Sequence, residues 1–508
     1  MRSQSFRRVP STKNNRDMKN LAGMVWIALL MACAMGMAQA QTYSIVASFN
    51  GTDGDLPATS PVQGVDGNFY GTTAIGGGSD AGNAYRVTPT GELTSIYIFC
   101  SLPNCVDGNQ PQSAMVLNPD GNFYGTTSAG GANLGSCFGP GCGTVFRLTP
   151  AGKLTTLYSF CPVANCLDGS VPLAALVLGG DGNFYGTTYN GGQNGRGTVF
   201  KISPSGKFQR LYSFCKLANC VDGSYPVTAL IQGRNGNFYG TTYDGGSVNC
   251  TFFGGTYGCG TIFEITAAGT LTTLYSFGTN AGLLQAPVVQ GSNGNLYGTS
   301  TNGGTGLCNY GCGTVFELTP AGSYSALYNF CTKEFCPDGA YPMAGLLQAT
   351  DGSMYGTTTT GGTGVGEGGT LFAMKPSGAL HTVYGFGGTP TGYEPEGTLL
   401  QATDGNFYGV TWGGGAENQG VVYQVAIGLG PYVQTVPTSG KTGTHVIILG
   451  NHLTGATAVT FNGTVSSFKV LSGTEITATV PSGATSGAVM VTVGGQTLKS
   501  NPGFQVLP

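Results

Sequence analysis

The sequence is poor in charged residues and in histidine. Asp, Glu, Lys and Arg together make up 8% of its 508 residues, against roughly 25% in an average soluble domain. Surface helices normally carry a charged face, so this shortage argues against a mainly helical protein. Only three histidines are present, which disfavours His-dependent catalysis and zinc sites with His ligands.

Long apolar runs are also scarce. The one long run, Leu21 to Met37, is followed by the small-x-small sequence Ala38-Gln39-Ala40, so residues 1–40 are predicted to be a signal peptide. Leu30 to Cys33 faintly resembles a lipoprotein box, which leaves lipidation at Cys33 as an alternative. No other run approaches the roughly 20 residues of a membrane span. We therefore expect an exported protein, extracellular or on the outer cell surface, with the periplasm as the alternative.

The charge balance excludes one class of partner. Beyond residue 40 the chain carries 14 Lys or Arg against 22 Asp or Glu. Such an acidic surface repels phosphate backbones, so nucleic acid is not expected as a partner.

Glycine and aromatic residues are abundant instead. The chain contains 89 Gly, 25 Tyr and 26 Phe, and its hydrophobic fraction is 40%. The glycines lack the Gly-X-Y period of collagen, and the apolar content argues against disorder. This composition predicts a turn-rich, all-β protein, and the chain length favours more than one structural unit.

Beyond residue 40, cysteines occur only as close neighbours along the chain. The seven pairs are Cys100/Cys105, Cys137/Cys142, Cys161/Cys166, Cys215/Cys220, Cys250/Cys259, Cys308/Cys312 and Cys331/Cys336. Seven pairs with no cysteine left over predict seven local disulfides in an oxidising compartment. Zinc needs four ligands at CxxC-like spacing or nearby His, so the disulfide interpretation is favoured.

The phrase Asp-Gly-Asn-Phe-Tyr-Gly-Thr-Thr recurs seven times with small changes. Its tyrosines are Tyr70, Tyr124, Tyr185, Tyr239, Tyr297, Tyr355 and Tyr408. A period of about 56 residues is longer than that of the common solenoid repeats and is typical of propellers. In the third copy the pattern predicts four strands. They are Leu173 to Leu178, Asn183 to Thr188, Gly197 to Ile202 and Phe208 to Phe214.

The two ends of the repeat region complement each other. Thr42 to Phe49 resembles a fourth strand with nothing before it, and the last copy stops after a third strand, Gly420 to Ile427. If these strands pair, the sheets close into a ring without open edges. The sequence therefore predicts a seven-bladed β-propeller over residues 42–428, closed by the N-terminal strand. The connections that contain the cysteine pairs then gather on one face, where binding usually resides.

The repeat resembles the GloVer-type tandem repeats of exported bacterial choice-of-anchor proteins. The resemblance rests on the DGNFYGTT phrase, the glycine pair after it and the GTVFxLTPxG segment, and it covers about residues 42–428. It implies a surface location, and it implies no activity. Members of this family carry differing C-terminal anchors, but no apolar sorting helix follows Pro508, so the resemblance leaves the mode of attachment open.

Residues 429–508 depart from the repeat and show short alternating strands. The strands are His445 to Leu449, Ala458 to Phe461, Glu475 to Val480 and Ala488 to Val493. Their number and the length of the segment predict a small β-sandwich. The strings PTSG at 437–440, GNHLTGA at 450–456 and VTFNG at 459–463 resemble an IPT/TIG domain. That resemblance implies an Ig-like fold and a role as a spacer or contact module.

Five repeats share an Asp-Gly-x-x-Pro sequence before the first strand. Its aspartates are Asp53, Asp107, Asp168, Asp222 and Asp338. Asp side chains bond the following backbone amides in turns, so turn capping is the favoured role. A ring of carboxylates that binds Ca²⁺ is the weaker alternative, because no EF-hand-like loop accompanies these residues. No other cofactor is expected.

Two sets of equivalent positions are candidates for ligand contact. The first set lies one residue past the proline of the Asp-Gly-x-x-Pro sequence, or past the equivalent residue in copies without that proline. Its members Gln112, Gln285 and Glu396 are expected near the mouth of the central channel. The second set lies just past each FYGTT segment, where the residue varies although its surroundings repeat. At this position Tyr189, Tyr243 and Trp412 could stack on sugars or peptide side chains.

The sequence thus predicts a non-catalytic binding or adhesion protein, with no enzymatic activity expected. Its ligand, favoured to be a glycan or another surface polymer but open to a protein, is expected on the face that carries the disulfide loops. One alternative is an extracellular carbohydrate-active enzyme that uses Glu394 and Glu396 as paired carboxylates. The other is an architectural envelope protein without a specific ligand. The sequence does not indicate the oligomeric state.

Overall fold

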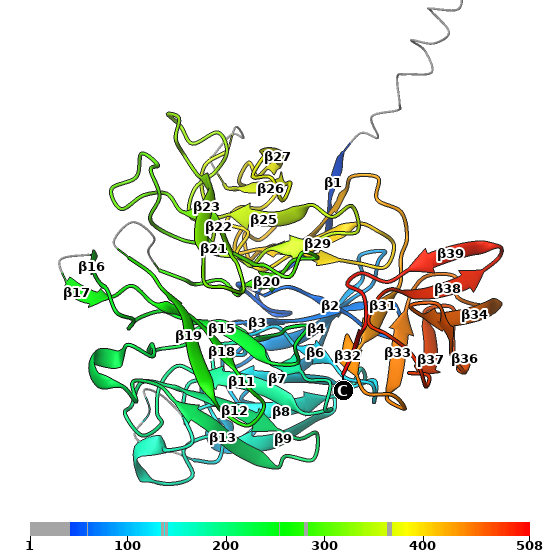
Figure 1. Cartoon of the computed structure of the whole chain (residues 1–508), viewed down its shortest axis with the longest axis horizontal. Helices are drawn as coiled ribbons and strands as arrows, with labels where there is room; N and C mark the ends of the chain where they lie inside the picture. The colour runs from blue at the N-terminus through cyan, green and yellow to red at the C-terminus, as the bar shows by residue number, and fades with distance from the viewer. Residues whose placement is uncertain are drawn as a thin grey trace, which may run out of the picture. The chain divides into compact units, whose positions relative to one another are not determined.

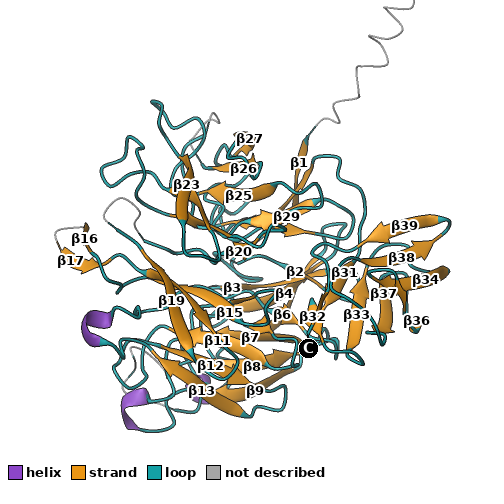
Figure 2. Ribbon diagram, in the orientation of Figure 1, coloured by secondary structure: helices purple, strands orange, loops and turns teal. Residues whose placement is uncertain are grey.

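The computed structural model describes residues 41–507 except 58, 134–136, 138–140, 253–254, 279–282 and 363–367. The predicted signal peptide lies outside these residues. The described chain consists of β-strands with three short 3-10 helices, Pro103–Cys105, Ala164–Cys166 and Ala218–Cys220 (Figure 2). The all-β prediction is confirmed. None of the helices in this part of the chain is long and apolar enough to span a membrane.

Seven four-stranded antiparallel sheets follow one another along the described chain, and we number them sheets 1 to 7 (Figure 1). Sheet 1 contains β2 (Val62–Gln63), β3 (Phe69–Thr73), β4 (Asn83–Val87) and β5 (Leu93–Ile98). Sheet 2 contains β6 (Val116–Leu117), β7 (Phe123–Thr127), β8 (Thr144–Leu148) and β9 (Leu154–Ser159). Sheet 3 contains β10 (Val177–Leu178), β11 (Phe184–Thr188), β12 (Thr198–Ile202) and β13 (Phe208–Ser213). Sheet 4 contains β14 (Ile231–Gln232), β15 (Phe238–Thr242), β18 (Thr261–Ile265) and β19 (Leu271–Ser276).

The remaining three sheets repeat this arrangement. Sheet 5 contains β20 (Val289–Gln290), β21 (Leu296–Ser300), β22 (Thr314–Leu318) and β23 (Tyr324–Asn329). Sheet 6 contains β24 (Leu347–Gln348), β25 (Met354–Thr358), β26 (Thr370–Met374) and β27 (Leu380–Gly385). Sheet 7 contains β28 (Leu400–Gln401), β29 (Phe407–Thr411), β30 (Val421–Ala426) and β1 (Thr42–Ser48). A small hairpin, β16 (Asn249–Phe252) with β17 (Gly255–Gly258), extends from sheet 4.

The N-terminal strand completes the last sheet. β1 pairs antiparallel with β30, and Tyr43 lies opposite Val425 in the register. The Phe49 amide adds a bond to the Gly420 carbonyl at 3.0 Å. The predicted pairing of the two ends of the repeat region is therefore confirmed.

Aromatic contacts join each sheet to the next. The tyrosine of one motif packs on the residue that immediately precedes the tyrosine of the following sheet, which is Phe in five of the seven copies. The ring pairs are Tyr70–Phe123 at 4.3 Å, Tyr124–Phe184 at 4.2 Å, Tyr185–Phe238 at 3.8 Å, Tyr355–Phe407 at 4.4 Å and Tyr408–Phe69 at 4.2 Å. In the other two junctions the tyrosines share core clusters with Leu296 and Met354. Because Tyr408 of sheet 7 packs on Phe69 of sheet 1, the contacts form a closed cycle, which we call the ring.

The other residues of the repeated motif also have structural roles. In sheet 2 the Asp120 carboxylate accepts a bond from the Tyr124 hydroxyl at 2.8 Å and holds the turn before β7. A Cβ at Gly125 would lie 2.6 Å from the ring of Phe146, so only glycine fits there. The Thr126 hydroxyl donates to the carbonyl of Ala174 in the next sheet at 3.1 Å. The motif recurs because it builds both the turn and the junction.

The innermost strands are shorter than predicted. In the third copy the sequence predicts a strand from Leu173 to Leu178, whereas β10 contains only Val177 and Leu178. The Ala174 carbonyl within the predicted strand accepts its bond from Thr126 of sheet 2 rather than from its own sheet. Contacts between neighbouring sheets replace the ladder bonds close to the axis of the ring.

The C-terminal residues form two further four-stranded sheets, the C-terminal sheet pair. One sheet has the order β31 (Gln434–Val436), β33 (His445–Leu449), β37 (Glu475–Thr479) and β36 (Phe468–Val470). The other has the order β35 (Thr464–Val465), β34 (Ala456–Phe461), β38 (Val489–Val493) and β39 (Gln496–Lys499). A short parallel pair links β32 (Ser439–Gly440) with β40 (Gln505–Val506). Side chains of both sheets, among them Ile448, Ile476, Phe461 and Val491, share one buried core.

The C-terminal sheet pair packs on the side of the ring that carries the tight turns between first and second strands, here the turn side. Hydrogen bonds reach the inner hairpins of sheets 1, 4, 6 and 7. They are Thr474 Oγ1 to the Val65 carbonyl at 2.6 Å, Ser439 Oγ to Gln232 Oε1 at 2.7 Å, Asn501 Nδ2 to the Gln348 carbonyl at 2.9 Å, and the Tyr432 hydroxyl to the Gln401 carbonyl. Ile447 and Leu449 are buried against sheets 1 and 2.

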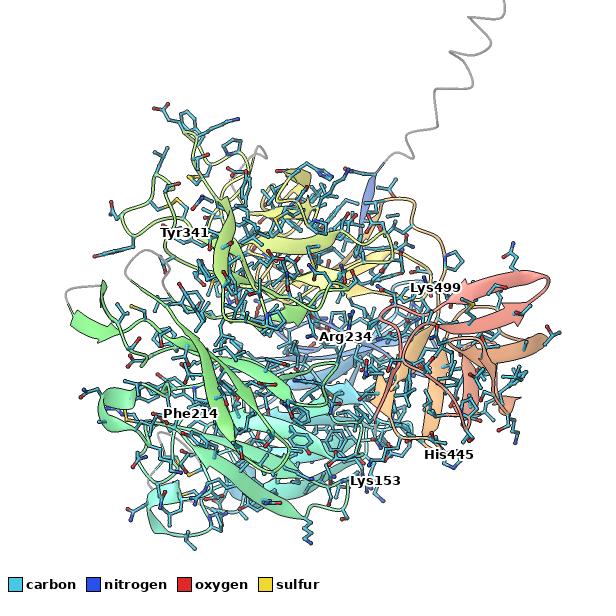
Figure 3. The ribbon with its side chains drawn as sticks, viewed as in Figure 1. Lys153, Phe214, Arg234, Tyr341, His445 and Lys499 are labelled. Carbon is cyan, nitrogen blue, oxygen red and sulfur yellow. A yellow bond between two sulfur atoms is a disulfide. The ribbon has the colours of Figure 1, made fainter. Side chains whose placement is uncertain are left out.

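A cavity of about 460 Å³ remains between the ring and the C-terminal sheet pair. Arg234 and Gln290 line it from the ring, and Asn501 and Phe504 line it from the pair. Figure 3 labels Arg234, together with His445 and Lys499 of the pair. The Arg234 guanidinium donates to the Ser292 carbonyl at 2.8 Å. The C-terminal residues thus cover the turn side, and the opposite side, here the loop side, carries the longer connections.

Candidate functional site

Disulfides fix the connections of the loop side. Six of the seven predicted bonds are present: Cys100–Cys105, Cys137–Cys142, Cys161–Cys166, Cys215–Cys220, Cys308–Cys312 and Cys331–Cys336. Each bond closes a loop of a few residues, so its main effect is on the local shape of the loop.

The seventh predicted pair, Cys250 with Cys259, is not among these six bonds. Cys259 is disulfide-bonded and fully buried, in a core cluster that it shares with Phe277 and Leu284. The side chain of Cys250 lies outside the described residues, so the structure does not identify the partner of Cys259. The bond between Cys250 and Cys259 is therefore not confirmed and stays a prediction.

A backbone bridge recurs on the loop side of all seven sheets. The residue before each proline position has a positive φ between 39° and 57°, and its carbonyl accepts a bond from the amide of the variable residue after FYGTT. The carbonyl residues are Leu56, Gln110, Val171, Tyr225, Leu283, Tyr341 and Glu394. The amide residues, in the same order, are Ala74, Ser128, Tyr189, Tyr243, Thr301, Thr359 and Trp412. A constant backbone therefore presents a pair of side chains that differs in every sheet.

A cavity of about 550 Å³ lies on the loop side where sheets 3 and 4 meet. Two of the predicted ligand-contact residues, Tyr189 and Tyr243, line it together. Sequence reasoning missed the other lining residues, among them Tyr225 and Arg196. Cys220 also lines the cavity, so the Cys215–Cys220 loop borders it.

The aromatic wall of the cavity is held together by ring contacts. The Tyr189 and Tyr225 rings lie 4.8 Å apart with an interplanar angle of 31°. The Arg196 guanidinium lies 4.9 Å from the centre of the Tyr225 ring and donates a hydrogen bond to its hydroxyl. The Tyr225 amide bonds the Arg196 carbonyl at 2.9 Å. The tilted contact with Tyr189, the cation over the ring and the backbone bond together set the direction of Tyr225.

The other wall of the cavity is polar. Asn219, Ser224 and Asp244 line it. The Asp244 carboxylate accepts bonds from the Gly245 and Gly258 amides, each at 2.6 Å. One wall therefore offers aromatic surface, and the other offers hydrogen-bonding groups, of which the Asp244 carboxylate is fixed by backbone amides. This combination suits a ligand with both an apolar face and hydroxyl groups.

Trp412 lies elsewhere on the loop side. It follows β29 in sheet 7, is 36% exposed, and its ring centre lies 6.5 Å from that of Tyr393. It does not line the cavity of Tyr189 and Tyr243. The structure therefore brings together two of the three predicted aromatic residues and places the third at another junction.

The residues predicted near the channel mouth differ in environment. Gln112 is exposed, and Gln285 is half-buried, with an Oε1 atom that finds no hydrogen-bond partner among the described residues. Glu396 is also half-buried. Burial, and to a smaller degree the charge of Glu394, raises the pKa of the Glu396 carboxyl. A carboxyl with a raised pKa could donate a proton, but a raised pKa alone does not identify a catalytic acid.

The aspartates of the Asp-Gly-x-x-Pro sequence bond to their own loops. Four carboxylates accept from a tyrosine hydroxyl of the preceding strand, at 2.8 or 2.9 Å. The pairs are Asp107 with Tyr97, Asp168 with Tyr158, Asp222 with Tyr212 and Asp338 with Tyr328. Asp53 accepts instead from the Asn50 amide at 2.9 Å, and burial raises the pKa of its carboxyl. These bonds hold each loop, but they come from residues that precede the aspartate and are not the predicted bonds to the following backbone amides.

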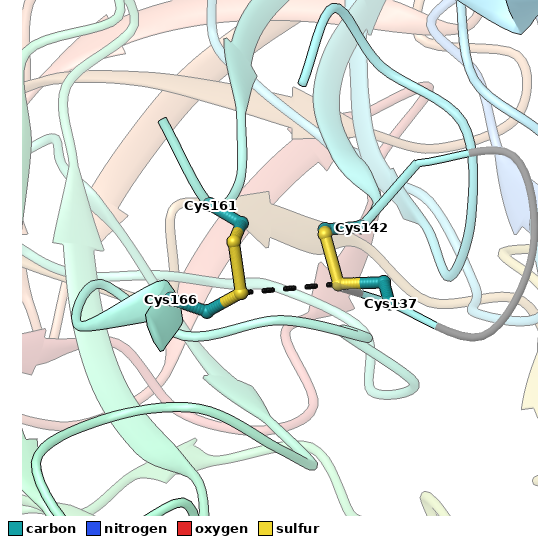
Figure 4. Close-up of side chains that lie close together, drawn as sticks. All are labelled: Cys137, Cys142, Cys161 and Cys166. Carbon is teal, nitrogen blue, oxygen red and sulfur yellow. Dashed lines mark hydrogen bonds between the residues drawn. A yellow bond between two sulfur atoms is a disulfide. The ribbon is translucent and has the colours of Figure 1, made fainter. Parts of the chain in front are cut away.

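The structure gives no support to the alternative of a carboxylate ring that binds Ca²⁺. Among the residues that the structure describes, the groups of His, Cys, Asp or Glu close enough to share a metal ion consist of cysteines alone. One such group contains Cys137, Cys142, Cys161 and Cys166, whose two disulfides lie side by side (Figure 4).

Comparison with known proteins identifies the family and leaves the activity open. Among solved structures the chain resembles auxiliary nutrient binding proteins from Bacteroides thetaiotaomicron (11% identity, 76% of each chain, TM-score 0.40) and Bacteroides ovatus (10%, 76% of each chain, TM-score 0.38). It also resembles a luciferin-regenerating enzyme (10%, 61% of this chain and 89% of that chain, TM-score 0.35). Scores this low carry no argument about function, and no curated protein matches the chain.

The family model for the repeat matches most of the chain. It describes a Gloeobacter/Verrucomicrobia repeat and matches residues 35–253 and 248–475. The second match extends past the seven sheets and into the C-terminal sheet pair. The chain therefore belongs to the Gloeobacter/Verrucomicrobia repeat family.

Proposed function

We propose that this chain is an exported, non-catalytic binding protein that holds a glycan on the loop side of a seven-bladed propeller. In this proposal the ring is the propeller, closed by β1, and the C-terminal sheet pair is an Ig-like domain of the IPT/TIG type. The closed cycle of aromatic contacts supports the propeller, and the two facing sheets with one core support the sandwich. The disulfides fit export, because such bonds persist in oxidising compartments.

The observation that carries the proposal is the cavity between sheets 3 and 4. A volume of about 550 Å³ lies within the usual range for small-molecule sites. Tyr189 and Tyr243 offer aromatic surface for the apolar side of a sugar, and the Tyr225 ring supports Tyr189 by packing against it. Asn219 and Ser224 can exchange hydrogen bonds with hydroxyl groups. Neighbouring sheets and a disulfide hold these residues on a rigid base, which lowers the entropic cost of binding.

A glycan array with the purified protein tests the ligand class, and two variants test the site. Tyr189→Ala and Tyr243→Ala are each expected to lower the affinity for the best-bound glycan at least about tenfold, because each removes a stacking face. Thr301→Ala is the matched control. Thr301 occupies the same position in sheet 5, and among the described residues its hydroxyl has no hydrogen-bond partner.

Three outcomes distinguish the glycan site from its alternatives. Loss of binding in both tyrosine variants, with Thr301→Ala unchanged, supports the glycan site. Unchanged binding in both tyrosine variants would show that the glycan binds outside this cavity. An array without any bound glycan would favour the architectural alternative, in which the disulfide loops have no ligand.

An extracellular carbohydrate-active enzyme is the second candidate. It is favoured by one observation, the half-buried Glu396 with its raised pKa beside Glu394. The positive φ of Glu394 adds nothing to this case, because the equivalent residue has a positive φ in all seven sheets. If this candidate is right, Glu396→Gln abolishes the release of reducing sugar from a bound polysaccharide, and binding persists. If no release occurs in the unmodified protein, the enzyme candidate fails.

A further inference from the structure

Two disulfides from separate loops meet on the loop side of sheet 2. Cys137–Cys142 lies in the connection between β7 and β8, and Cys161–Cys166 lies in the connection that follows β9. The Sγ atoms of Cys137 and Cys166 are 3.9 Å apart, and all four Sγ atoms lie within 4.8 Å of one another (Figure 4). Cys142, Cys161 and Cys166 are buried, and Cys137 is half-buried.

This arrangement is close to that of a four-cysteine metal site. In such a site each sulfur lies about 2.3 Å from the zinc ion, which places the sulfurs of a tetrahedron roughly 3.8 Å apart. The two disulfides already approach each other to this separation. Reduction breaks the S–S bond of each pair and leaves its two sulfurs free to reach this separation. Both pairs have four residues between their cysteines, a spacing that zinc sites use.

The loops are held in place by bonds that do not involve sulfur. The Val171 amide donates to the Cys142 carbonyl at 2.9 Å. The Gly169 and Gly192 amides donate to the Cys166 carbonyl, each at 2.9 Å. The Cys161 amide donates to the Asp168 carboxylate at 3.0 Å. Because these bonds do not depend on sulfur, they keep Cys142, Cys161 and Cys166 in place in the reduced chain, and Cys137 is only five residues from Cys142 along the chain.

We propose that Cys137, Cys142, Cys161 and Cys166 form a tetrathiolate site for Zn²⁺ or a similar soft divalent cation once both disulfides are reduced. Reduction takes two electrons and two protons per disulfide from a dithiol reductant, which is itself oxidised to a disulfide. Each S–S bond then breaks to give two thiols. The cation displaces the four thiol protons and forms four metal–sulfur bonds. In the oxidised chain the same sulfurs form the two disulfides.

The chain contains matched loops that lack a partner pair. Cys100–Cys105 and Cys215–Cys220 occupy the same connection as Cys161–Cys166, with the same spacing. The connections between second and third strands in sheets 1 and 3 contain no cysteine, so neither loop has an equivalent of Cys137–Cys142 within its own sheet. These two loops are therefore internal controls for the effect that a second, adjacent cysteine pair has on metal binding.

A related group occurs in sheet 5. The Sγ atoms of Cys308, Cys312 and Cys331 lie within 4.8 Å of one another, and the three residues come from the same two connections as in sheet 2. Cys336, bonded to Cys331, does not belong to this group. Three clustered thiolates offer an incomplete set for a tetrahedral ion, so we expect this second group to bind more weakly.

The test uses the whole chain, reduced with excess dithiothreitol without air, freed of the reductant, and then titrated with Co²⁺. Tetrahedral Co²⁺ bound to thiolates gives a strong visible absorption that Zn²⁺ abolishes by displacement. Cys137→Ala/Cys142→Ala is expected to remove at least about half of the absorption at one equivalent of Co²⁺, since the complete tetrathiolate site is lost. Cys215→Ala/Cys220→Ala is the matched control and is expected to keep it.

A second measurement needs no variant. The reduced chain is alkylated with iodoacetamide with and without Zn²⁺, and the modified cysteines are mapped by mass spectrometry. Zn²⁺ is expected to protect the four cysteines of the sheet 2 group at least about tenfold relative to Cys100, Cys105, Cys215 and Cys220. Equal protection of all loops would overturn the proposal. So would the absence of a thiolate–Co²⁺ absorption, or a reduced chain whose near-ultraviolet circular dichroism is lost and is not restored by the metal.

Discussion

On the turn side of the ring a repeated side chain bonds to the backbone of the neighbouring sheet, whereas on the loop side a repeated backbone carries side chains that differ from sheet to sheet. Turn-side glutamines show the first behaviour. In five sheets a glutamine at the end of the first strand accepts a bond from a backbone amide in the turn of the preceding sheet. The glutamines are Gln63, Gln232, Gln290, Gln348 and Gln401.

The loop side shows the second behaviour. The bridge between the residue before the proline position and the residue after FYGTT recurs seven times, yet it joins Val171 to Tyr189 in one sheet and Glu394 to Trp412 in another. Repetition without variation therefore marks residues that build the ring, and variation on a repeated backbone marks the surface available for a ligand. The predictions below test this contrast, beginning with the largest expected effect.

Phe69→Ala removes an aromatic contact at the junction between sheets 7 and 1. Phe69 is 1% exposed, and its ring lies 4.2 Å from that of Tyr408. We expect the free energy of unfolding to fall by about 3–5 kcal/mol, measured by urea denaturation. Phe69→Leu is the control, because Leu296 occupies the same position in sheet 5, and it is expected to cost about 1 kcal/mol. A cost below about 1 kcal/mol for Phe69→Ala would argue against a closed ring.

Gln63→Leu removes the hydrogen-bonding groups of a turn-side glutamine and keeps a side chain of similar volume. Gln63 Oε1 accepts from the Thr403 amide at 3.0 Å, and Gln63 Nε2 donates to Thr403 Oγ1 at 3.1 Å. Leucine fits this position, since Leu117 and Leu178 occupy it in sheets 2 and 3. We expect a loss of about 2 kcal/mol in the free energy of unfolding, because the buried Thr403 groups lose their partners. A loss near zero would indicate that the glutamines are not needed to join the sheets.

The architecture was predictable because its signals lie close together in the sequence. Thr42 to Phe49 could be assigned to sheet 7 because the last copy of the repeat lacks a fourth strand. The disulfides could be assigned because each cysteine has a neighbour four or five positions away in the six confirmed pairs. The short inner strands were not predictable, because propensity does not report that the Ala174 carbonyl bonds to a different sheet.

The candidate site was only half predictable. Tyr189 and Tyr243 stood out because their position varies within a repeated phrase. Tyr225 varies in the same way before its proline, so the same comparison of repeats could have found it. Arg196 could not have been found, because its contact with Tyr225 depends on how sheets 3 and 4 meet. The meeting of Cys137–Cys142 with Cys161–Cys166 likewise depends on two connections that are separate in the sequence.

Glu396→Gln tests a loop-side carboxyl whose environment penalises the charge. Burial is the larger cause of its raised pKa, and the charge of Glu394 is the smaller cause. A pKa raised in the folded state contributes stability that is present below the unfolded pKa and is lost as the pH rises through the folded pKa. The variant is therefore expected to be more stable than the unmodified protein by up to about 1 kcal/mol at pH 7 and equal to it near pH 3. A variant that is less stable at pH 7 would contradict this account.

Lys201→Ala tests a turn-side carboxyl with the opposite sign. Burial works against the charge of Asp181, but hydrogen bonds from Lys201, Asn183 and Tyr185 outweigh it and lower the pKa of the Asp181 carboxyl. Lys201 Nζ lies 2.8 Å from Asp181 Oδ2, with both side chains partly exposed.

The sign of the effect follows from the direction of this shift. A pKa lowered in the folded state gives stability that is present above the unfolded pKa and is lost as the pH falls through the folded pKa. Because the ion pair is partly exposed, Lys201→Ala is expected to cost only about 0.5 kcal/mol at pH 7, and less as Asp181 becomes protonated. Urea denaturation from pH 7 to pH 2 measures both limits. Lys201→Met, which keeps the apolar stem over the Tyr185 ring, separates the charge from the packing. If both variants cost the same at every pH, the interaction is packing, and the contrast with Glu396 is not electrostatic.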